Sequence, residues 1–400
     1  RERFMKITAL KTYPFSVPTG GNSRDPHSGE LLCSTKKSWL FVKLETDAGI
    51  SGWGEGSGEW LVPQVEAMLK ELWPLLIDRD PTQVEALCED LANRSPWKGG
   101  PINGTAIAAI NMALYDICGK AWNVPVYTLL GGKRRDRVQV YASGGLVETS
   151  PEDAAEAAKQ SIAQGYSGIK GNPLEARRWP MDSSSIERSI AAIAAAREAM
   201  GPEGAIMLDT HGSPTPELAI EFSRHVAPYT PLFIEEPTKV GSVDALLDIT
   251  QRSQVPIATG EKLFTVRDFD ELISRRACAF LQPDITHCFG ITAIRQIAAA
   301  AEKQEMLMAP HNAAGPIGTA ATIHADAAIP NFLIQEMCPS YFEIFSDYAE
   351  HDWIIADGYI NVSDRPGFGI EVKEADIAKL PHEPMAYRQY RHADGSWKGW

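Results

Sequence analysis

Three acidic residues in the middle of the chain have the types and the spacing of a metal site. Asp209, Glu235 and Glu261 follow one another at intervals of 26 residues, and each follows a short apolar run in AIMLDTHG, PLFIEEP and PIATGEK. Such runs, bounded by Gly or Pro, are typical of buried strands, and the segments between them have helical patterns. Repeated strand–helix–strand units predict parallel neighbouring strands, whose carboxyl ends bring the three acids to one point.

Acids gathered in this way would repel one another and raise one another's pKa. A hard divalent cation with oxygen ligands removes that repulsion, and we predict Mg²⁺ as the cofactor. The alternative, three solvated loop acids, does not explain their matched positions.

Other predicted strands also end in polar residues, namely Lys170, Asp284, His311 and Glu336. In parallel barrels the chemistry lies at the C-terminal ends of the strands. Buried ionisable groups without partners are costly, so we expect these residues to serve one another or a ligand.

Two histidines are candidates for proton transfer. His211 lies two residues after Asp209, so on an extended chain it would face the same side as that ligand. His311 and Asp284 end neighbouring predicted strands, and a carboxylate beside an imidazole fixes its tautomer and raises its basicity. The alternatives are a hydrogen-bonding role for His211 and a structural Asp–His pair. No role is assigned to the other histidines, which are His27, His225, His287, His324, His351, His382 and His392.

The elements that position these residues form a barrel. Residues 136–340 read as eight strands with seven intervening helices, which predicts a (β/α)₇β modified TIM barrel of the α/β class. The strands are expected in VQVYAS, SGIKGN, the three acidic segments, CAFLQPD, EMLMAPH and NFLIQEM.

The remaining residues are expected to form a capping unit. Residues 1–135 read as three antiparallel strands followed by three helices, an α+β domain, and residues 341–400 are expected to return to this cap. Between the first two strands, the polar segment from Thr19 to Lys37 is a candidate lid, with a disordered excursion as the alternative.

Composition excludes several classes of function. The net charge of −14, without a dense Lys/Arg run, argues against nucleic acid or an anionic membrane as partner. The six cysteines lack CxxC spacing, and no stretch of 18 apolar residues or signal peptide is evident, so we expect a cytoplasmic protein. We also expect a homo-oligomer.

The chain resembles the mandelate racemase subgroup of the enolase superfamily, and within it the galactonate dehydratases and related acid-sugar dehydratases. The resemblance covers nearly the whole chain. It rests on GWGE at 52–55, KGGP at 98–101, IAAINMALYDICGK at 107–120, LDTHG at 208–212, LFIEEP at 232–237, LQPDITHCFGIT at 281–292, APHNAAGPIG at 309–318 and the final RHADGSWKGW.

The resemblance implies a role for each candidate residue. It implies Mg²⁺ ligation by the three acids, with His311 as the base at C2, His211 as the acid for the departing 3-hydroxyl, and Glu336 near the substrate carboxylate. Lys170 and Asn172 occupy the K-x-N positions of the second strand, where racemases of this subgroup carry two lysines. Lys170 is therefore a catalytic candidate, Asn172 is a substrate-binding candidate, and the asparagine speaks against racemisation.

The leading interpretation is a lyase, an acid-sugar hydro-lyase that converts an aldonate to a 2-keto-3-deoxy acid. The alternative on the same scaffold is cycloisomerisation or epimerisation of a sugar acid or lactone. A third possibility is a catalytically weak binding protein with a regulatory role, against which the intact His211, Asp284 and His311 argue.

Overall fold

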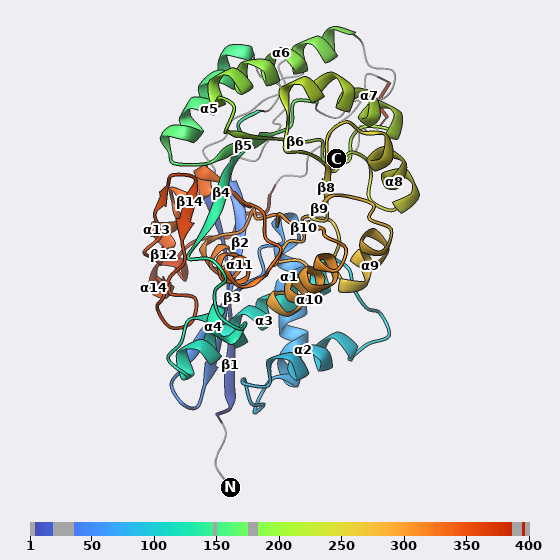
Figure 1. The fold of residues 1–400 in the computed structure, drawn as a ribbon. Helices are drawn as coiled ribbons and strands as arrows, with labels where there is room; N and C mark the ends of the chain where they lie inside the picture. The colour runs from blue at the N-terminus through green and yellow to red at the C-terminus, as the bar shows by residue number, and fades with distance from the viewer. Residues whose placement is uncertain (1–4, 19–35, 147–149, 175–182, 386–393, 397–400) are drawn as a thin grey trace.

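The computed structural model describes residues 5–18, 36–146, 150–174, 183–385 and 394–396 (Figure 1). A parallel barrel and its surrounding helices occupy the upper part of the view, and an α+β cap occupies the lower part. None of the helices in the described segments is long and apolar enough to cross a bilayer. The five cysteines of these segments are free thiols.

The barrel is closed by a continuous ring of short parallel strands. Strands β4 to β10 pair in chain order, β11 pairs with β4, and a parallel bridge between Met308 and Phe332 joins the remaining sides. The predicted (β/α)₇β barrel with an α+β cap is confirmed. The eight strands are β4 (Arg137–Ser143), β5 (Gly168–Gly171), β6 (Ala205–Asp209), β7 (Phe233–Glu235), β8 (Ile257–Thr259), β9 (Phe280–Leu281), β10 (Leu307–Met308) and β11 (Gln335–Met337).

Helices connect the successive barrel strands, and four of those described begin at a capping side chain. The side chains of Ser150, Thr215, Ser242 and Thr265 each accept a backbone N–H in the first turn of the helix that follows. Between the described barrel strands lie α5 (Pro151–Ala163), α6 (Ser183–Met200), α7 (Pro216–Val226), α8 (Val243–Arg252), α9 (Val266–Ser274), α10 (Ile291–Glu302) and α11 (Pro316–Ala328).

The cap packs an antiparallel sheet against a long buried helix. In β3, Gly52 and Gly54 permit this contact, because a Cβ at these positions would lie 2.1 and 1.8 Å from the carbonyl oxygens of Ala113 and Ala109 in α3. The cap comprises β1 (Ile7–Pro18), β2 (Lys36–Thr46), β3 (Ser51–Glu55), α1 (Val62–Leu72), α2 (Val84–Asn93), α3 (Pro101–Ala121) and α4 (Val126–Leu129).

The C-terminal segment contacts both parts of the molecule. Glu374 accepts hydrogen bonds from the Tyr13 hydroxyl at 2.5 Å and the Lys43 ammonium at 2.7 Å, which ties it to the cap. The segment also adds β14 to the start of β4, an attachment to the barrel that the sequence did not predict. Its elements are α12 (Pro339–Phe342), α13 (Phe345–Tyr348), β12 (Ala349–Glu350), β13 (Ile355–Ala356), β14 (Tyr359–Asn361), β15 (Glu371–Val372) and α14 (Glu374–Ile377).

The predicted C-terminal boundary of the candidate lid, residues 19–37, is wrong. Lys36 and Lys37 belong to β2, where they pair with Pro18 and Val17 of β1. The alternating pattern of β2 therefore begins two residues earlier than the sequence suggested. Residues 19–35 lie outside the described residues.

Candidate active site

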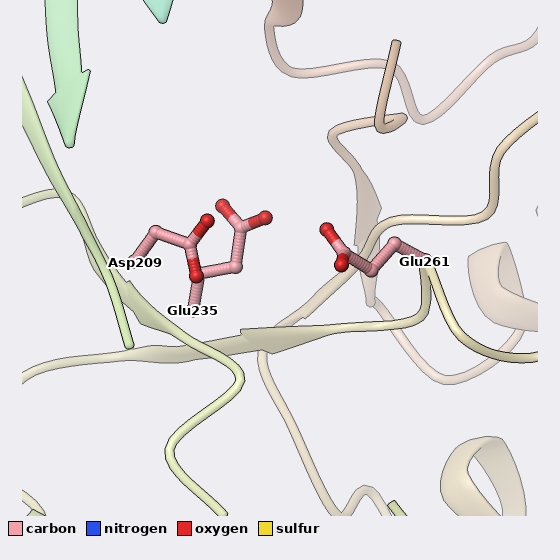
Figure 2. A group of neighbouring side chains, drawn as sticks. All are labelled: Asp209, Glu235 and Glu261. Atoms are coloured by element: carbon pink, nitrogen blue, oxygen red, sulfur yellow. The ribbon is translucent and has the colours of Figure 1, made fainter. Parts of the chain in front are cut away.

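The three predicted metal ligands lie at the carboxyl ends of adjacent strands. Asp209 and Glu235 are the last residues of β6 and β7 and are register partners, and Glu261 lies two residues beyond the end of β8. Figure 2 shows the three side chains facing a common space. One oxygen from each carboxylate lies within 4.8 Å of the others.

A buried lysine lies among these acids. The ammonium of Lys170, in β5, donates to both carboxylate oxygens of Glu235 at 2.9 Å and lies 2.9 Å from an oxygen of Glu336. It also lies 3.8 Å from Asp209. Burial lowers the pKa of Lys170, but these acids outweigh burial and hold the pKa well above its usual value. Lys170 is therefore a fixed positive charge.

One lysine does not neutralise the cluster. The pKa of Glu235 is raised to about 8, first by burial and also by Asp209, Glu336 and Glu261, against the opposing effect of Lys170. A divalent cation held by the three carboxylates would remove this repulsion, and oxygen donors of this kind suit a hard cation. The residues present thus fit a divalent metal site.

His211 lies directly against Asp209. Its backbone N–H donates to Asp209 Oδ1 at 2.9 Å, and its Nε2 lies 2.9 Å from Asp209 Oδ2. Burial lowers the pKa of His211, but Asp209 outweighs burial and raises the pKa to about 9.

The backbone at His211 differs from the extended conformation that the sequence predicted. The residue has φ of 49°, in the left-handed region, so the chain turns after Asp209 instead of continuing as a strand. Glu236, directly after Glu235, has φ of 46°. Strained turns of this kind are found at functional sites, and here they follow two of the metal-ligand strands.

His311 lies at the other end of the carboxylate cluster. Its Nδ1 is 2.6 Å from Asp284 Oδ2, and its Nε2 is 3.5 Å from Glu261 and 3.9 Å from Glu336. Asp284 also accepts hydrogen bonds from the backbone N–H and the hydroxyl of Thr286. Burial lowers the pKa of His311, but Glu261 and the other two acids raise it well above its usual value.

Asn172 supports His211 in this structure. Its amide nitrogen lies 3.1 Å from His211 Nδ1, and its oxygen accepts the backbone N–H of Leu174 at 3.2 Å. When the His211 ring is neutral, the amide Nδ2–H donates to Nδ1, which leaves the ring proton on Nε2, facing Asp209. Asn172 is buried and its amide contacts His211, which is a positioning contact. The substrate contact expected for Asn172 stays a prediction.

A cavity of about 450 Å³ opens above the strand ends. Its walls come from both parts of the molecule, which agrees with a site enclosed between barrel and cap. The barrel contributes Lys170, Asp209, His211, Glu261, Lys262, Asp284, His311 and Glu336, and the cap contributes Lys37, Ser57, Gly58, Glu59, Trp60, Leu61, Pro101 and Thr105.

Several polar residues of this site were not predicted from the sequence. Lys262 forms ion pairs with Glu236 and Glu261, and both Lys262 and Glu236 directly follow predicted ligands in GEK and IEEP, which was an available signal. His287, which was set aside, lines the cavity with Nε2 3.8 Å from Asp284. For Lys37 and Glu59, 22 residues apart, the sequence offered no signal.

The fold, the carboxylate cluster and the paired histidines together define an enolase-type enzyme. A family model described as enolase C-terminal domain-like matches residues 153–376, and a model of the mandelate racemase / muconate lactonizing enzyme N-terminal domain matches residues 15–131. The chain belongs to the mandelate racemase / muconate lactonizing enzyme group of the enolase superfamily.

Curated relatives narrow the class further. The chain is 35% identical over 371 residues to a D-galactonate dehydratase of Ralstonia pickettii (strain 12J), which covers 90% of this chain and 96% of the relative. A D-galactonate dehydratase of Variovorax paradoxus (strain S110) is 34% identical over the same shares. The expectation of an enzyme of the hydro-lyase class is confirmed by these relatives.

Solved structures of the superfamily have the same fold. An enolase superfamily member from Salmonella Typhimurium superposes with a TM-score of 0.84 at 28% identity, covering 94% of this chain and 99% of the other. An enolase from Agrobacterium radiobacter, provisionally named a galactarate dehydratase and solved with Na and L-malate bound, also gives 0.84 at 28% identity, covering 98% and 99%.

Proposed function

We propose that this enzyme is an Mg²⁺-dependent acid-sugar dehydratase that acts on an aldonate. It removes the proton from C2, next to the substrate carboxylate, and eliminates the 3-hydroxyl as water to give a 2-keto-3-deoxy acid. The observation that carries the proposal is the position of the two imidazoles. His211 contacts Asp209 at one end of the carboxylate cluster, and His311 contacts Glu261 at the other end. Elimination of water needs a base and an acid at two adjacent carbons, and this arrangement supplies both.

Each residue has a defined task in this proposal. Asp209, Glu235 and Glu261 would hold the Mg²⁺, and when bound the cation supplies positive charge for the charge that develops on the substrate carboxylate. The neutral form of His311 accepts the C2 proton at Nε2, while Asp284 orients the ring through Nδ1. The electron pair released from the C2–H bond is first held on the substrate carboxylate as an enediolate, and it then forms the C2–C3 double bond as the C3–O bond breaks. His211 delivers the proton held on Nε2 to the departing hydroxyl, and the enol product then tautomerises to the keto acid.

Lys170 and Glu336 complete the anchoring end of the site. Lys170 contributes its fixed positive charge beside the carboxylate cluster, where an anionic substrate group needs compensation. Glu336 contacts both Lys170 and the backbone N–H of Asn312, next to His311. These contacts hold His311 and the Lys170 ammonium in fixed positions relative to each other.

The proposal is tested by incubating the purified protein and Mg²⁺ with a panel of aldonates and aldarates. A keto-acid product that reacts with semicarbazide, together with a new C3 methylene group in the proton NMR spectrum, is the expected result. Chelation of the metal should abolish product formation, and added Mg²⁺ should restore it. An epimer or a lactone as the product, without a keto acid, would contradict the proposal.

A further inference from the structure

A charged pair from the cap forms part of the cavity wall. The Lys37 ammonium, in β2, lies 3.2 Å from Glu59 Oε1, and both residues line the cavity. Lys37 also donates to the backbone oxygen of Ala313 at 2.5 Å and lies 4.7 Å from the centre of the Tyr341 ring. These contacts place the pair beside the segments that follow β10 and β11, whereas the metal ligands follow β6 to β8.

Lys37 is held rigidly and remains charged. Its side chain is 3% exposed, whereas that of Glu59 is 33% exposed. Burial lowers the pKa of Lys37, but Tyr341 and Glu59 outweigh burial and hold it above its usual value. The lysine therefore fixes the position of the Glu59 carboxylate, and the glutamate is the member of the pair with the more accessible side chain.

The described part of the cavity wall offers a second substrate carboxylate little positive charge. Within the described residues, each lysine of the wall is already paired with an acid: Lys37 with Glu59, Lys170 with Glu235 and Lys262 with Glu261. A free carboxylate near Glu59 would meet like charge at short range in a partly enclosed site, which is unfavourable. A hydroxyl group would instead donate a hydrogen bond to the Glu59 carboxylate, and hydrogen bonds to charged groups are the stronger ones.

From these contacts we infer that Glu59, positioned by Lys37, binds hydroxyl groups at the end of the substrate remote from the metal and selects monocarboxylic sugar acids against dicarboxylic ones. This inference rests on the proposed function, because it takes the substrate carboxylate to be anchored at the metal. The relative from Agrobacterium radiobacter was solved with L-malate, which is a dicarboxylate. The shared fold therefore does not by itself exclude diacids, and discrimination must come from residues such as Glu59.

The test compares two substrates that differ only at C6, D-galactonate and galactarate, with the full-length protein and Mg²⁺. The wild-type kcat/KM should favour the aldonate. Glu59→Gln should lower this preference by roughly 10-fold to 100-fold, the size expected for one hydrogen bond to a charged group, mainly through KM. Glu71→Gln, the same change at an exposed position of the cap, is the matched control and should leave the preference unchanged.

A second variant examines the lysine. Lys37→Met should raise KM for the aldonate, because Glu59 loses the cation that holds it, whereas Lys36→Met on the same strand should not. If Lys37→Met fails to fold, Glu59→Gln still decides the question. An unchanged substrate preference in Glu59→Gln, or a wild-type preference for galactarate, would overturn the inference.

A failure of the proposed function can be distinguished from a failure of the inference about Glu59. If the wild-type protein dehydrates no sugar acid of the panel, calorimetric binding of the two acids in the presence of Mg²⁺ still tests the inference. Tighter binding of galactonate that is lost in Glu59→Gln would support selection by Glu59. Equal affinities for the two acids in the wild-type protein would refute it.

Discussion

At the scale of single residues, the main feature of the site is an excess of buried negative charge. Asp209, Glu235 and Glu336 surround the Lys170 ammonium, and Glu261 pairs with Lys262. The two imidazoles contact Asp209 and Glu261. In a region of low dielectric constant this charge would be costly without a further cation. A divalent cation held by the oxygens of Asp209, Glu235 and Glu261 would balance this charge.

The role of Glu235 as a ligand leads to the first prediction. Glu235→Gln should abolish activity and weaken Mg²⁺ binding by roughly 10-fold to 100-fold, because a neutral amide is a poorer ligand for a hard cation than a carboxylate. Titration calorimetry measures the affinity. Glu217→Gln, an exposed change in the helix that follows β6, is the control. Unchanged affinity in Glu235→Gln would remove this residue from the ligand set.

The second prediction separates the two histidines. Both His211→Asn and His311→Asn should disable dehydration, because acid or base assistance is typically worth about 10²–10⁴ in rate. In D₂O, His211→Asn should still exchange the C2 proton of the substrate with solvent, since His311 and Asp284 remain. His311→Asn should not exchange it. Proton NMR with a confirmed substrate measures the proton exchange. The reverse pattern would make His211 the base and His311 the acid.

At the scale of secondary-structure elements, one cap residue organises the N-terminus of α11. Glu55, the last residue of β3, is fully buried and accepts the backbone N–H groups of Gly315 at 2.6 Å and Gly318 at 2.8 Å. The hydroxyl of Ser57 donates to the same carboxylate. The segment held in this way begins four residues after His311, so a strand of the cap helps to position the barrel loop that follows His311.

The third prediction concerns this cap. Glu55→Gln should lower the free energy of unfolding by about 1.5–3 kcal/mol, because it replaces charge-assisted hydrogen bonds and places an amide N–H against backbone donors. It should also raise KM, because the loop after His311 loses its support. Ser150→Ala, which removes an exposed helix cap, should cost only about 1 kcal/mol and leave KM unchanged. Chemical denaturation and steady-state kinetics measure both effects, and a wild-type KM in Glu55→Gln would contradict the positioning role.

A buried histidine joins α11, α4 and the C-terminal segment. His324 Nδ1 accepts the backbone N–H of Tyr127 at 3.2 Å, and Nε2 lies 3.3 Å from the carbonyl oxygen of Phe368. Its ring stacks on the Tyr127 ring at 5.6 Å. Burial lowers the pKa of His324 to about 4, against the smaller effect of Phe368. His324 is therefore neutral in the folded protein at neutral pH.

The fourth prediction is a loss of stability in mild acid. Between pH 6.5 and about 4 the unfolded chain binds a proton at this position and the folded chain does not, so stability falls as the pH falls. The full effect is roughly 3 kcal/mol. His324→Gln keeps a donor and an acceptor but cannot titrate, so its denaturation midpoint should depend less on pH in this window. The exposed His225→Gln is the control, and an equal pH dependence in His324→Gln and the wild type would contradict the prediction.

At the scale of the whole molecule, the site exists only where the barrel and the cap meet. The strands that carry the metal ligands all belong to the barrel, whereas the far wall of the cavity comes from β2, the segment after β3 and the start of α3. The C-terminal segment fixes these parts to each other through Glu374 on the cap and β14 on the barrel. Metal binding should therefore stabilise the barrel as a unit.

The fifth prediction follows from the three-strand origin of the ligands. Saturating Mg²⁺ should raise the melting temperature, because a ligand that binds only the folded state adds about 2.7 kcal/mol at 100 times its dissociation constant. Differential scanning calorimetry with Mg²⁺ and with chelator measures the shift, and Glu235→Gln should lose most of it. A melting temperature that does not respond to Mg²⁺ in an enzyme whose activity requires it would contradict this prediction.

The sequence by itself determined the barrel and the convergence of the three acids. Short apolar runs at a regular period specify parallel strands, and parallel strands place their carboxyl ends at one edge, so Asp209, Glu235 and Glu261 could be grouped without coordinates. The Asp284–His311 contact follows from the same rule, because β9 and β10 are neighbours. These relations are local or repeat at a fixed period, and periodicity is the information that a single sequence carries.

Only the tertiary structure decided how the site is completed. The turn at His211 brings the imidazole back onto Asp209, and the amide of Asn172 meets that ring from another strand. The Lys37–Glu59 pair joins two segments of the cap above the barrel. Such contacts depend on the packing of one domain against another and on backbone conformations that no pattern of residue types specifies. They set the pKa of His211 and the charge of the cavity wall, and those physical quantities belong to the folded chain alone.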